Sequence, residues 1–535
     1  MPSHRIRARP PRGLPETPTR LSEVDELAVY LRDAAHTPGG HASSVVLPKT
    51  EAELAQALRT EASLLPVGAQ SSLTGGATPF GGCVVSLARL DAIGSLEPGR
   101  ARVGAGLSLL ALERELRPRR LFYPPTPTFT GASLGGTAAT NASGAATFKY
   151  GSTRDWVRAL TVVLANGEVL DLERGECLAS SEGQFEVVLT GGEVLRVAVP
   201  TYSMPRVAKR SAGYHAEPGM DLMDLFVGSE GTLGVITEVE IGLLPEPVRL
   251  TGWCTFASES AALAAVGHLR DASRATWSAR DPHGIDIAAI ESIDRRGLQL
   301  LREDGKDREH GVRLEPSADT AIVFQAELPA GVDAGAAMDQ IGRLDEADGP
   351  DTPLTRLCRL LREHGALESL ELALPGDTRR AEQLRALREA VPSAVNHRIG
   401  LAQRTADPQV RKTAADMIVP FEQLAEMMAL YREAFGRRGL DHALWGHVSD
   451  GNIHANVLPR SGSEVRSGED AILELGVQVV SFGGCPLSEH GVGRNATKQR
   501  LLRLLYGDDG IAQMRRVKAA LDPQWKLSPG VLFPR

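Results

Sequence analysis

Three glycine-rich segments follow one another in the first half of the chain, and they limit the possible folds more than any other feature. They span residues 66–77, 131–155 and 228–234. Glycine allows a backbone to approach a ligand closely, and successive backbone N–H groups can form a concave nest for a pyrophosphate. A single segment of this kind is usually a plain turn. Three in order, each with its own hydroxyl or carboxylate side chains, favour a cofactor site.

The two standard nucleotide fingerprints are both missing from the sequence. No G-x-G-x-x-G opens a helix after the first strand, and no G-x-x-x-x-G-K-[ST] occurs. Gly104-Ala105-Gly106 lacks the third glycine and is interpreted as a turn at a strand end. A cofactor site built from these segments is therefore of neither the Rossmann nor the P-loop type.

The pattern of apolar residues changes at Pro245-Glu246-Pro247, which marks a domain boundary. Residues 21–247 combine short β-branched runs, dense glycine and helical stretches, whereas residues 248–480 carry apolar residues mainly at helical spacing, with strand-like pieces between them. A chain of 535 residues is also too long for one core. We expect two domains over these ranges, a C-terminal segment over residues 481–535, and a disordered tail over residues 1–20.

Charge, hydropathy and cysteine usage exclude several classes of protein. A net charge of −8 argues against a nucleic-acid-binding protein, which normally carries a basic stripe. No apolar run approaches the ~20 residues that span a bilayer. The five cysteines are scattered, with no C-x-x-C pair, which is typical of a reducing compartment and excludes an iron–sulfur cluster of ordinary ligand spacing on this chain. We expect a cytoplasmic protein without a transmembrane segment, or one peripheral at the inner face of the membrane.

Residues 447–454 read His-Val-Ser-Asp-Gly-Asn-Ile-His and predict a β-hairpin. Asp450-Gly451 is a preferred two-residue turn, because both residues tolerate a positive φ. Such a turn pairs His447 with His454 on one face, with their Cβ atoms roughly 4.5–5.5 Å apart. Two imidazoles at that spacing can hold one metal ion, and Glu489 could add an oxygen ligand. Each histidine taken alone is more often structural than a ligand, so both interpretations stay open.

Several motifs together resemble the flavoprotein family that binds FAD in the fold of vanillyl-alcohol oxidase and p-cresol methylhydroxylase. Within that family the chain is most similar to the branch of D-lactate, glycolate and D-2-hydroxyglutarate dehydrogenases. The resemblance runs from about residue 45 to the C-terminus. The motifs are residues 68–76, Tyr123-Pro124-Pro125, Gly135-Gly136, residues 141–144, Tyr150-Gly151, residues 228–234, the histidine hairpin, Glu489-His490-Gly491, Leu521-Asp522-Pro523 and Pro529-Gly530.

The resemblance implies an α+β protein with a two-subdomain FAD-binding domain over residues 21–247 and an α+β cap domain over residues 248–480. Residues 481–535 would return to the FAD-binding domain and complete the active site. The loop Gly75-Gly76-Ala77 offers neither a histidine nor a cysteine for covalent attachment, so non-covalent FAD is expected. The residues implied to contact FAD are Gly68, Gln70, Ser71, Ser72, Gly75, Gly76, Pro125, Thr126, Ser133, Gly136, Ser143, Ser152, Glu230, Gly231 and Ile236.

The resemblance also implies a reaction, in which a D-2-hydroxy acid is oxidised to the 2-oxo acid by hydride transfer to FAD. A divalent metal, Zn²⁺ or Mn²⁺, held by His447, His454 and Glu489 would lower the pKa of the substrate hydroxyl group. His490 would accept the hydroxyl proton. The residues implied to bind the substrate are Arg388, which would clamp its carboxylate, Lys412 and Asn456.

Other functions remain open at this point. An ether-lipid-forming alkyl transferase shares the FAD-binding fold, but the run of consecutive histidines of such proteins is absent from this chain. A metal hydrolase would explain the histidine set but not the glycine-rich segments. A flavoprotein subunit of a larger electron-transfer complex is a further alternative. A dehydrogenase also needs an external electron acceptor, namely a quinone, a cytochrome, an electron-transfer flavoprotein or an iron–sulfur subunit, and it could form a homodimer.

Overall fold

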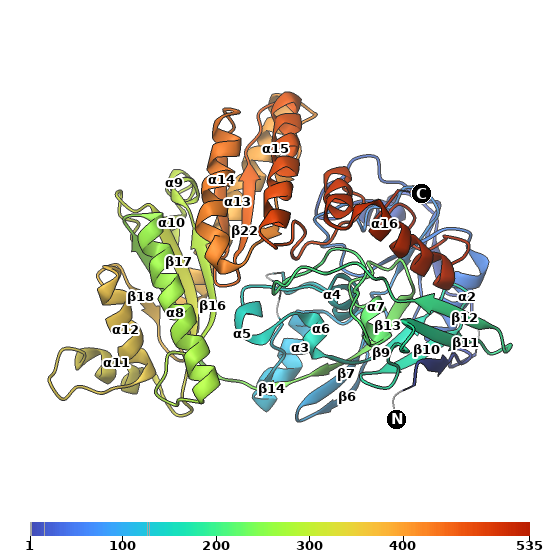
Figure 1. Ribbon diagram of the computed structural model, residues 1–535, viewed down its shortest axis with the longest axis horizontal. Coiled ribbons are helices and arrows are strands. Elements are labelled where there is room, and N and C mark those ends of the chain that lie inside the picture. The colour runs from blue at the N-terminus through green and yellow to red at the C-terminus, as the bar shows by residue number, and fades with distance from the viewer. Residues whose placement is uncertain (1–2, 15, 126, 128, 535) are drawn as a thin grey trace. The chain divides into compact units, whose positions relative to one another are not determined.

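The computed structural model describes residues 3–14, 16–125, 127 and 129–534, and it divides into two compact units (Figure 1). Unit 1 consists of residues up to Gly144, Gly151–Glu246 and Cys485–Arg535. Unit 2 consists of Ala145–Tyr150 and Pro247–Gly484. The short segment Ala145–Tyr150, which lies within residues 21–247, belongs to unit 2, and the C-terminal segment from Cys485 belongs to unit 1.

Unit 1 is built on two main sheets and a smaller one. The first main sheet has the order β2-β3-β5-β4, with β3, β5 and β4 parallel, and the second is antiparallel with the order β10-β9-β13-β7-β6. The smaller sheet has the order β1-β11-β12, and β8 pairs with β14. The bounds are β1 Arg5–Arg7, β2 Thr19–Leu21, β3 Ser44–Leu47, β4 Leu64–Val67, β5 Cys83–Ser86, β6 Ile93–Glu97, β7 Arg100–Gly104, β8 Leu121–Phe122, β9 Val157–Val163, β10 Val169–Glu173, β11 Gln184–Val188, β12 Val194–Ala198, β13 Val235–Gly242 and β14 Leu244–Pro245.

Helices connect and cover these sheets. In α2 the side chain of Thr50 accepts a hydrogen bond from the backbone N–H of Glu53, which satisfies an otherwise unpaired donor at the helix start. The long helix α16 is interrupted at Gly507, whose backbone is not helical. The bounds in unit 1 are α1 Val24–Leu27, α2 Glu51–Thr60, α3 Leu109–Leu116, α4 Leu134–Thr140, α6 Thr153–Trp156, α7 Met223–Phe226 and α16 Ala496–Leu521.

The prediction of a disordered tail over residues 1–20 is wrong for the part that the structure describes. β1 pairs in parallel with β11, and β2 pairs with β3. The guanidinium group of Arg9 forms ion pairs with Glu51 and with Asp171, at 2.7 and 2.5 Å. Arg9 thus ties the N-terminal segment to carboxylates of unit 1, and the prolines of this segment do not prevent strand pairing beside them.

Unit 2 contains a single large antiparallel sheet with the order β18-β15-β17-β16-β21-β22-β19, and β20 pairs with β22. Helices α9 and α13 pack on this sheet through a cluster of buried apolar side chains that includes Trp253, Leu298, Leu387 and Trp445. The strands are β15 Val248–Phe256, β16 Ile287–Ile293, β17 Thr320–Leu328, β18 Glu371–Ala373, β19 Thr413–Ala414, β20 Met417–Ile418, β21 His442–His447 and β22 Asn452–Val457. The helices are α5 Thr147–Tyr150, α8 Glu259–Ala279, α9 Arg295–Glu303, α10 Lys306–Glu309, α11 Ala334–Gly342, α12 Pro353–Glu363, α13 Thr378–Thr405, α14 Leu424–Gly436 and α15 Gly462–Ser481.

The histidine hairpin forms, but its register differs from the predicted one. β21 and β22 pair His447 with Asn452 and Trp445 with His454, so a four-residue loop replaces the two-residue Asp-Gly turn. The reason lies in the buried Ser449, whose hydroxyl group accepts a hydrogen bond from the backbone N–H of Ile290 on β16. The two histidines are therefore diagonal rather than directly opposed. Their rings still approach each other, with centroids 5.4 Å apart.

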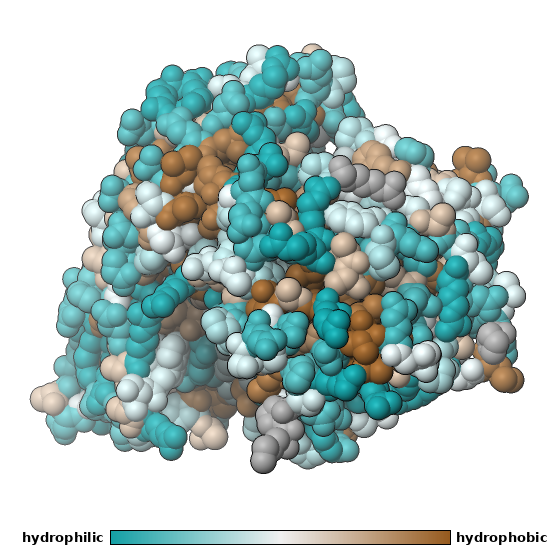
Figure 2. Space-filling model, turned by 45° about the vertical axis from the view of Figure 1, so that its right-hand side comes forward, coloured by the Kyte–Doolittle hydropathy of each residue, from teal (hydrophilic) through white to brown (hydrophobic). Residues whose placement is uncertain are grey.

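Hydrophilic residues are interspersed with hydrophobic ones over the face that Figure 2 presents. Among the described residues, no helix is both long and apolar enough to cross a membrane.

Candidate active site

A cavity of about 300 Å³ lies in unit 1, where the three glycine-rich segments meet. Most of the residues expected to contact a cofactor line it. They are Gly68, Gln70, Ser71, Ser72, Gly76, Ser133, Gly136, Ser143, Glu230, Gly231 and Ile236. Glu489 and His490 line the same cavity. The chain thus gathers glycine backbone, hydroxyl groups and the predicted proton acceptor around one space.

The polar groups around this cavity fit an FAD molecule. Among the described residues, no protein acceptor takes a hydrogen bond from the backbone N–H groups of Ser71, Ser72 or Gly76, so these donors can bind phosphate oxygens. The buried hydroxyl group of Ser143 likewise has no hydrogen-bond partner in the part of the chain that the structure describes. A buried polar group of this kind costs free energy unless a ligand or water satisfies it. At Gly68 the backbone runs so close to Ser133 that an added Cβ would lie 2.1 Å from the Ser133 hydroxyl oxygen.

Three of the expected cofactor residues that the structure describes do not line the cavity. Gly75 has φ +72°, and an added Cβ would lie 2.8 Å from the hydroxyl oxygen of Thr37. Ser152 is the N-cap of α6, where its backbone N–H and its side chain are both bonded to Asp155. Pro125 is buried away from the cavity, and Thr126 lies outside the described residues. Gly75 and Ser152 therefore support neighbouring structure rather than facing the cavity.

The segment that carries Glu489 and His490 is fixed on both sides within unit 1. Before it, the backbone N–H of Ser211 donates to the carbonyl oxygens of Leu487 and Ser488. After it, the buried carboxylate of Glu230 accepts hydrogen bonds of 2.8 Å from the backbone N–H groups of Val492 and Gly493. Burial raises the pKa of Glu230, although these two backbone hydrogen bonds act in the opposite direction.

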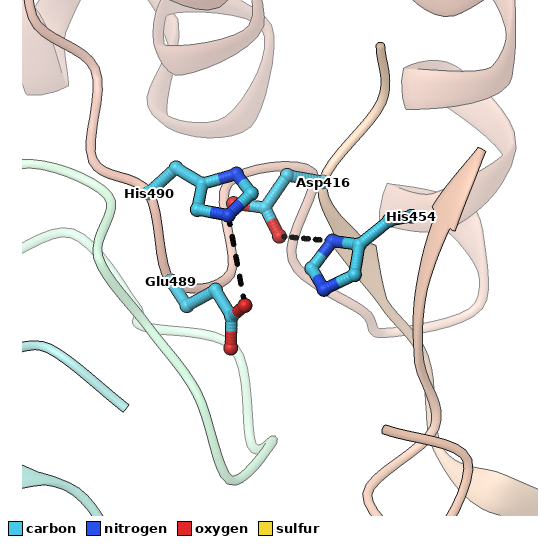
Figure 3. Close-up of side chains that lie close together, drawn as sticks. All are labelled: Asp416, His454, Glu489 and His490. Atoms are coloured by element: carbon cyan, nitrogen blue, oxygen red, sulfur yellow. Dashed lines mark ion pairs between the residues drawn. The ribbon is translucent and has the colours of Figure 1, made fainter. Parts of the chain in front are cut away.

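Two further charged groups define the surroundings of Glu489. The ammonium group of the fully buried Lys209 lies 3.0 Å from Glu489 Oε2, and His490 Nε2 lies 3.6 Å from Glu489 Oε1 (Figure 3). The separation of His490 and Glu489 is that of an ion pair rather than of a hydrogen bond.

Each histidine of the hairpin in unit 2 faces a carboxylate through Nδ1. His447 Nδ1 lies 3.4 Å from Glu291, and His454 Nδ1 lies 3.5 Å from Asp416 (Figure 3 shows the second pair). All four side chains are buried or nearly so. A carboxylate at Nδ1 favours the tautomer that leaves Nε2 unprotonated, which is the common arrangement for histidine ligands of metal ions. The diagonal register is therefore compatible with both histidines binding one metal ion.

Arg388 is buried in α13, and its guanidinium group forms an ion pair with Glu291. Burial alone would raise the pKa of Glu291, but the charge of Arg388 and the contact with His447 lower it to about 2. Glu291 therefore stays ionised at neutral pH and binds Arg388 and His447 at the same time. The ion pair uses Nη2 of Arg388 and leaves the opposite side of the guanidinium fork for an anionic ligand.

The remaining predicted substrate residues both lie in unit 2. Asn456 is buried on β22, where its Nδ2 donates to the carbonyl oxygen of His454 and its Oδ1 has no protein partner among the described residues. Lys412 Nζ lies 3.2 Å from Asn396 Oδ1 at the surface. Asn456 thus has the burial and the spare acceptor expected of a binding residue, whereas Lys412 has a surface partner.

Sequence reasoning did not single out Lys209, Glu291 or Asp416. Asp416 had a local signal, because it is a lone carboxylate inside the apolar run from Ala414 to Val419 and is 3 % exposed. Lys209 precedes Arg210, and such a basic pair suggests a solvated surface rather than a buried ammonium. Lys209 and Glu291 are revealed only by tertiary contacts.

Two family models match this chain and together cover most of it. The FAD binding domain matches residues 42–173, and the C-terminal domain of FAD linked oxidases matches residues 256–532. The chain therefore belongs to the FAD-linked oxidases, and FAD is its cofactor. The expectations of this family and of an α+β fold with an FAD-binding domain are confirmed.

Several curated proteins are similar along nearly the whole chain. Glycolate oxidase subunit GlcD of Bacillus subtilis (strain 168) is 27% identical over 517 residues, which cover 95% of this chain and 92% of that protein. D-lactate dehydrogenase of Anaerostipes hadrus is 26% identical, with 95% and 91% covered. D-2-hydroxyglutarate dehydrogenase of Xanthomonas citri pv. viticola is 27% identical, with 96% and 93% covered.

Solved structures show the same fold at low sequence identity. The 4-ethylphenol oxidase from Gulosibacter chungangensis matches with a TM-score of 0.64 and 15% identity, covering 96% of this chain and 94% of that one. An alkyldihydroxyacetonephosphate synthase matches with a TM-score of 0.59 and 14% identity, covering 95% and 82%. Proteins with different reactions share this fold, so the reaction depends on the residues of the site.

Proposed function

We propose that this protein is an FAD-dependent dehydrogenase that oxidises a D-2-hydroxy acid to the corresponding 2-oxo acid with the help of a divalent metal ion. The observation that carries the proposal is the occurrence of His490 beside Glu489 on the wall of the FAD cavity. The names of the similar proteins, which are glycolate, D-lactate and D-2-hydroxyglutarate enzymes, support the same class of substrate.

The chain's own residues supply the acid–base and binding steps. His490 accepts the proton of the substrate hydroxyl group. Arg388 binds the substrate carboxylate through the side of its guanidinium fork that Glu291 does not use. Asn456, which is buried on β22, is a further residue to contact the substrate. When bound, FAD supplies a two-electron acceptor and a divalent ion supplies Lewis acidity toward the hydroxyl oxygen.

The residues proposed to hold the ion are His447, His454 and Glu489. Support comes from the carboxylates at Nδ1 of the two histidines, which leave each Nε2 as a ligand. Asp416 would act as the carboxylate that orients His454, or as a fourth ligand. Imidazole and carboxylate ligands suit Zn²⁺ or Mn²⁺.

The electron acceptor and the mode of FAD binding complete the proposal. The first glycine-rich loop contains no histidine or cysteine between Gly68 and Ala77, which supports non-covalent binding of FAD. Electrons would leave to an external quinone, cytochrome, electron-transfer flavoprotein or iron–sulfur subunit, because the scattered cysteines cannot form a cluster of ordinary spacing.

The test is an anaerobic titration of the purified FAD-loaded protein with the D- and L-forms of lactate and 2-hydroxyglutarate, and with glycolate. We expect a D-acid to bleach the visible flavin absorbance, a chelator to prevent the bleaching, and added Zn²⁺ or Mn²⁺ to restore it. If no 2-hydroxy acid bleaches the flavin, the proposed substrate class is wrong. If the chelator does not affect the bleaching, the proposed role of the metal ion is wrong, but the proposed dehydrogenase activity stands.

A further inference from the structure

Arg494 lies four residues after His490 and is bonded to the first glycine-rich loop. Its Nη1 donates to the carbonyl oxygens of Gly75, Gly76 and Thr78 at 3.3, 3.1 and 2.8 Å. Its backbone N–H donates to the carbonyl oxygen of Thr74. The segment that begins with Glu489 and His490 therefore ends in a guanidinium group that binds the first glycine-rich loop, residues 66–77, directly.

The same guanidinium group reaches a third part of unit 1. Nε and Nη2 donate to the carbonyl oxygen of Pro529, at 3.2 and 2.9 Å. Burial lowers the pKa of Arg494 to about 10, so the group stays charged at neutral pH. A planar fork with several fixed donors can hold two chain segments at once, which the flexible ammonium group of a lysine does not do equally well.

These hydrogen bonds fix the direction of the loop's free donors. In a trans peptide the carbonyl oxygen and the following N–H point to opposite sides. The carbonyl of Gly75 is bonded to Arg494, so the N–H of Gly76 points away from Arg494, and Gly76 lines the FAD cavity. No described protein group accepts that N–H. Arg494 thus holds a donor ready for an anionic ligand.

The contact between the two segments is also tight. Gly493 has φ +56°, and an added Cβ would lie 2.2 Å from the hydroxyl oxygen of Thr74. On the other side of Gly493, Glu230 binds the backbone N–H groups of Val492 and Gly493. A change in the position of the loop is therefore transmitted to the residues that follow His490, because there is no free space between them.

We propose that Arg494 is a positioning residue that couples FAD occupancy to the order of the segment bearing Glu489 and His490. FAD binding to the loop stabilises the peptide orientations that Arg494 holds, and through Arg494 it stabilises residues 489–494. By reciprocity, an intact segment raises the affinity of the loop for FAD. The part of this proposal that concerns His490 as proton acceptor rests on the proposed function, whereas the coupling itself does not.

The test uses the full chain as the FAD-free and FAD-loaded protein, with the variants Arg494→Lys and Arg494→Met. We expect FAD loading of the wild type to slow hydrogen exchange at the N–H groups of Val492, Gly493 and Arg494. Both variants lose charge-assisted hydrogen bonds, which should raise the dissociation constant for FAD by about tenfold to a hundredfold. The increase should be larger for Arg494→Met than for Arg494→Lys. The matched control is Arg59→Lys, since Arg59 also donates to backbone carbonyls, of Asn166 and Gly167, away from the cavity.

The outcomes separate the possibilities. Unchanged FAD affinity in Arg494→Lys, with wild-type exchange protection, overturns the proposal. If neither variant folds, the wild-type exchange experiment decides alone, because equal exchange with and without FAD overturns the coupling. A loss of FAD affinity equal to that of the Arg59→Lys control also overturns it. The coupling can also be observed as expected in a protein whose flavin no 2-hydroxy acid reduces. In that case this proposal stands and only the proposed function is wrong.

Discussion

The ammonium group of Lys209 lies 3.0 Å from the carboxylate of Glu489, and the side chain of Lys209 is fully buried. A buried ammonium ion loses its hydration, so it requires a nearby anion. Glu489 is the residue proposed to bind the metal ion, and its neighbour His490 is the proposed proton acceptor. Lys209 is thus placed to hold Glu489 ionised and in one orientation.

Replacement of Lys209 by methionine should destabilise unit 1, because it leaves the carboxylate of Glu489 without this counter-charge. Breaking a buried ion pair on one side typically costs roughly 3 kcal/mol. The double variant Lys209→Met/Glu489→Gln should recover much of that loss, since it removes both charges together. Thermal unfolding of the FAD-loaded proteins measures the effect. Equal melting temperatures for Lys209→Met and the wild type would contradict the role assigned to this pair.

The Lys209–Glu489 pair illustrates what the sequence alone could not predict. The two residues are separated by 280 positions, and neither local periodicity nor a motif connects them. By contrast, local patterns predicted the elements well. The amphipathic spacing of Glu51–Thr60 indicates α2, and the β-branched pair Val84-Val85 indicates β5, because such patterns act within a few residues.

The hairpin shows where local rules are insufficient. Asp450-Gly451 has the chemistry of a two-residue turn, yet the buried hydrogen bond of Ser449 to Ile290 selects a longer loop. A tertiary contact therefore overrides the turn preference, and the register moves with it. The glycine-rich segments did predict the cavity, because close backbone approach needs glycine whatever the surrounding packing is.

Replacement of His490 by glutamine should preserve the visible flavin spectrum but slow flavin reduction by the substrate. General-base catalysis typically contributes 10²–10⁴-fold, so a loss of about that size is expected. Stopped-flow reduction under anaerobic conditions measures the rate. His442→Gln is the control, because His442 is likewise a part-buried histidine, but it lies on β21, packs against Phe435 and pairs through Nδ1 with the carbonyl oxygen of Leu440. Reduction of His490→Gln at the wild-type rate would remove His490 from the proton-transfer step.

Replacement of Asp416 by asparagine should weaken metal binding without removing a proposed histidine ligand. A carboxylate that orients a metal-binding histidine typically contributes a factor of about 10–100 to the metal affinity. Calorimetric titration of the metal-free protein with Zn²⁺ measures this factor. Asp339→Asn, at an exposed position in α11, serves as the control. If Asp416→Asn and Asp339→Asn bind Zn²⁺ equally well, Asp416 has no part in the site.

Replacement of Arg388 by lysine should raise KM for the substrate more than it lowers kcat. Lysine keeps the charge next to Glu291 but loses the fork that binds a carboxylate through two donors. A decrease of kcat/KM by about tenfold to a hundredfold is expected from the loss of one charge-assisted hydrogen bond. Arg385→Lys is the matched control, because Arg385 is an exposed arginine on the same helix paired with Glu382. A variant of Arg388 with unchanged KM would argue against the carboxylate clamp.

Asp294 provides a pH-dependent prediction for the stability of unit 2. Its side chain caps α9 by accepting a hydrogen bond from the backbone N–H of Gly297, and burial raises its pKa from 3.8 to about 7. The folded state therefore binds a proton more tightly than the unfolded state. Its contribution to stability is fully present below about pH 4 and is lost as the pH rises to about 7.

The variant Asp294→Asn should remove this dependence, because asparagine can cap the helix but does not ionise. Between pH 4 and pH 7 the melting temperature of the wild type should fall relative to that of the variant, by an amount that corresponds to roughly 1–3 kcal/mol. The difference should stay constant above about pH 8. Asp333→Asn, which changes the exposed N-cap of α11, controls for the loss of a carboxylate at a helix start. A difference between Asp294→Asn and the wild type that is the same at pH 4 and pH 8 would show that Asp294 is ionised throughout.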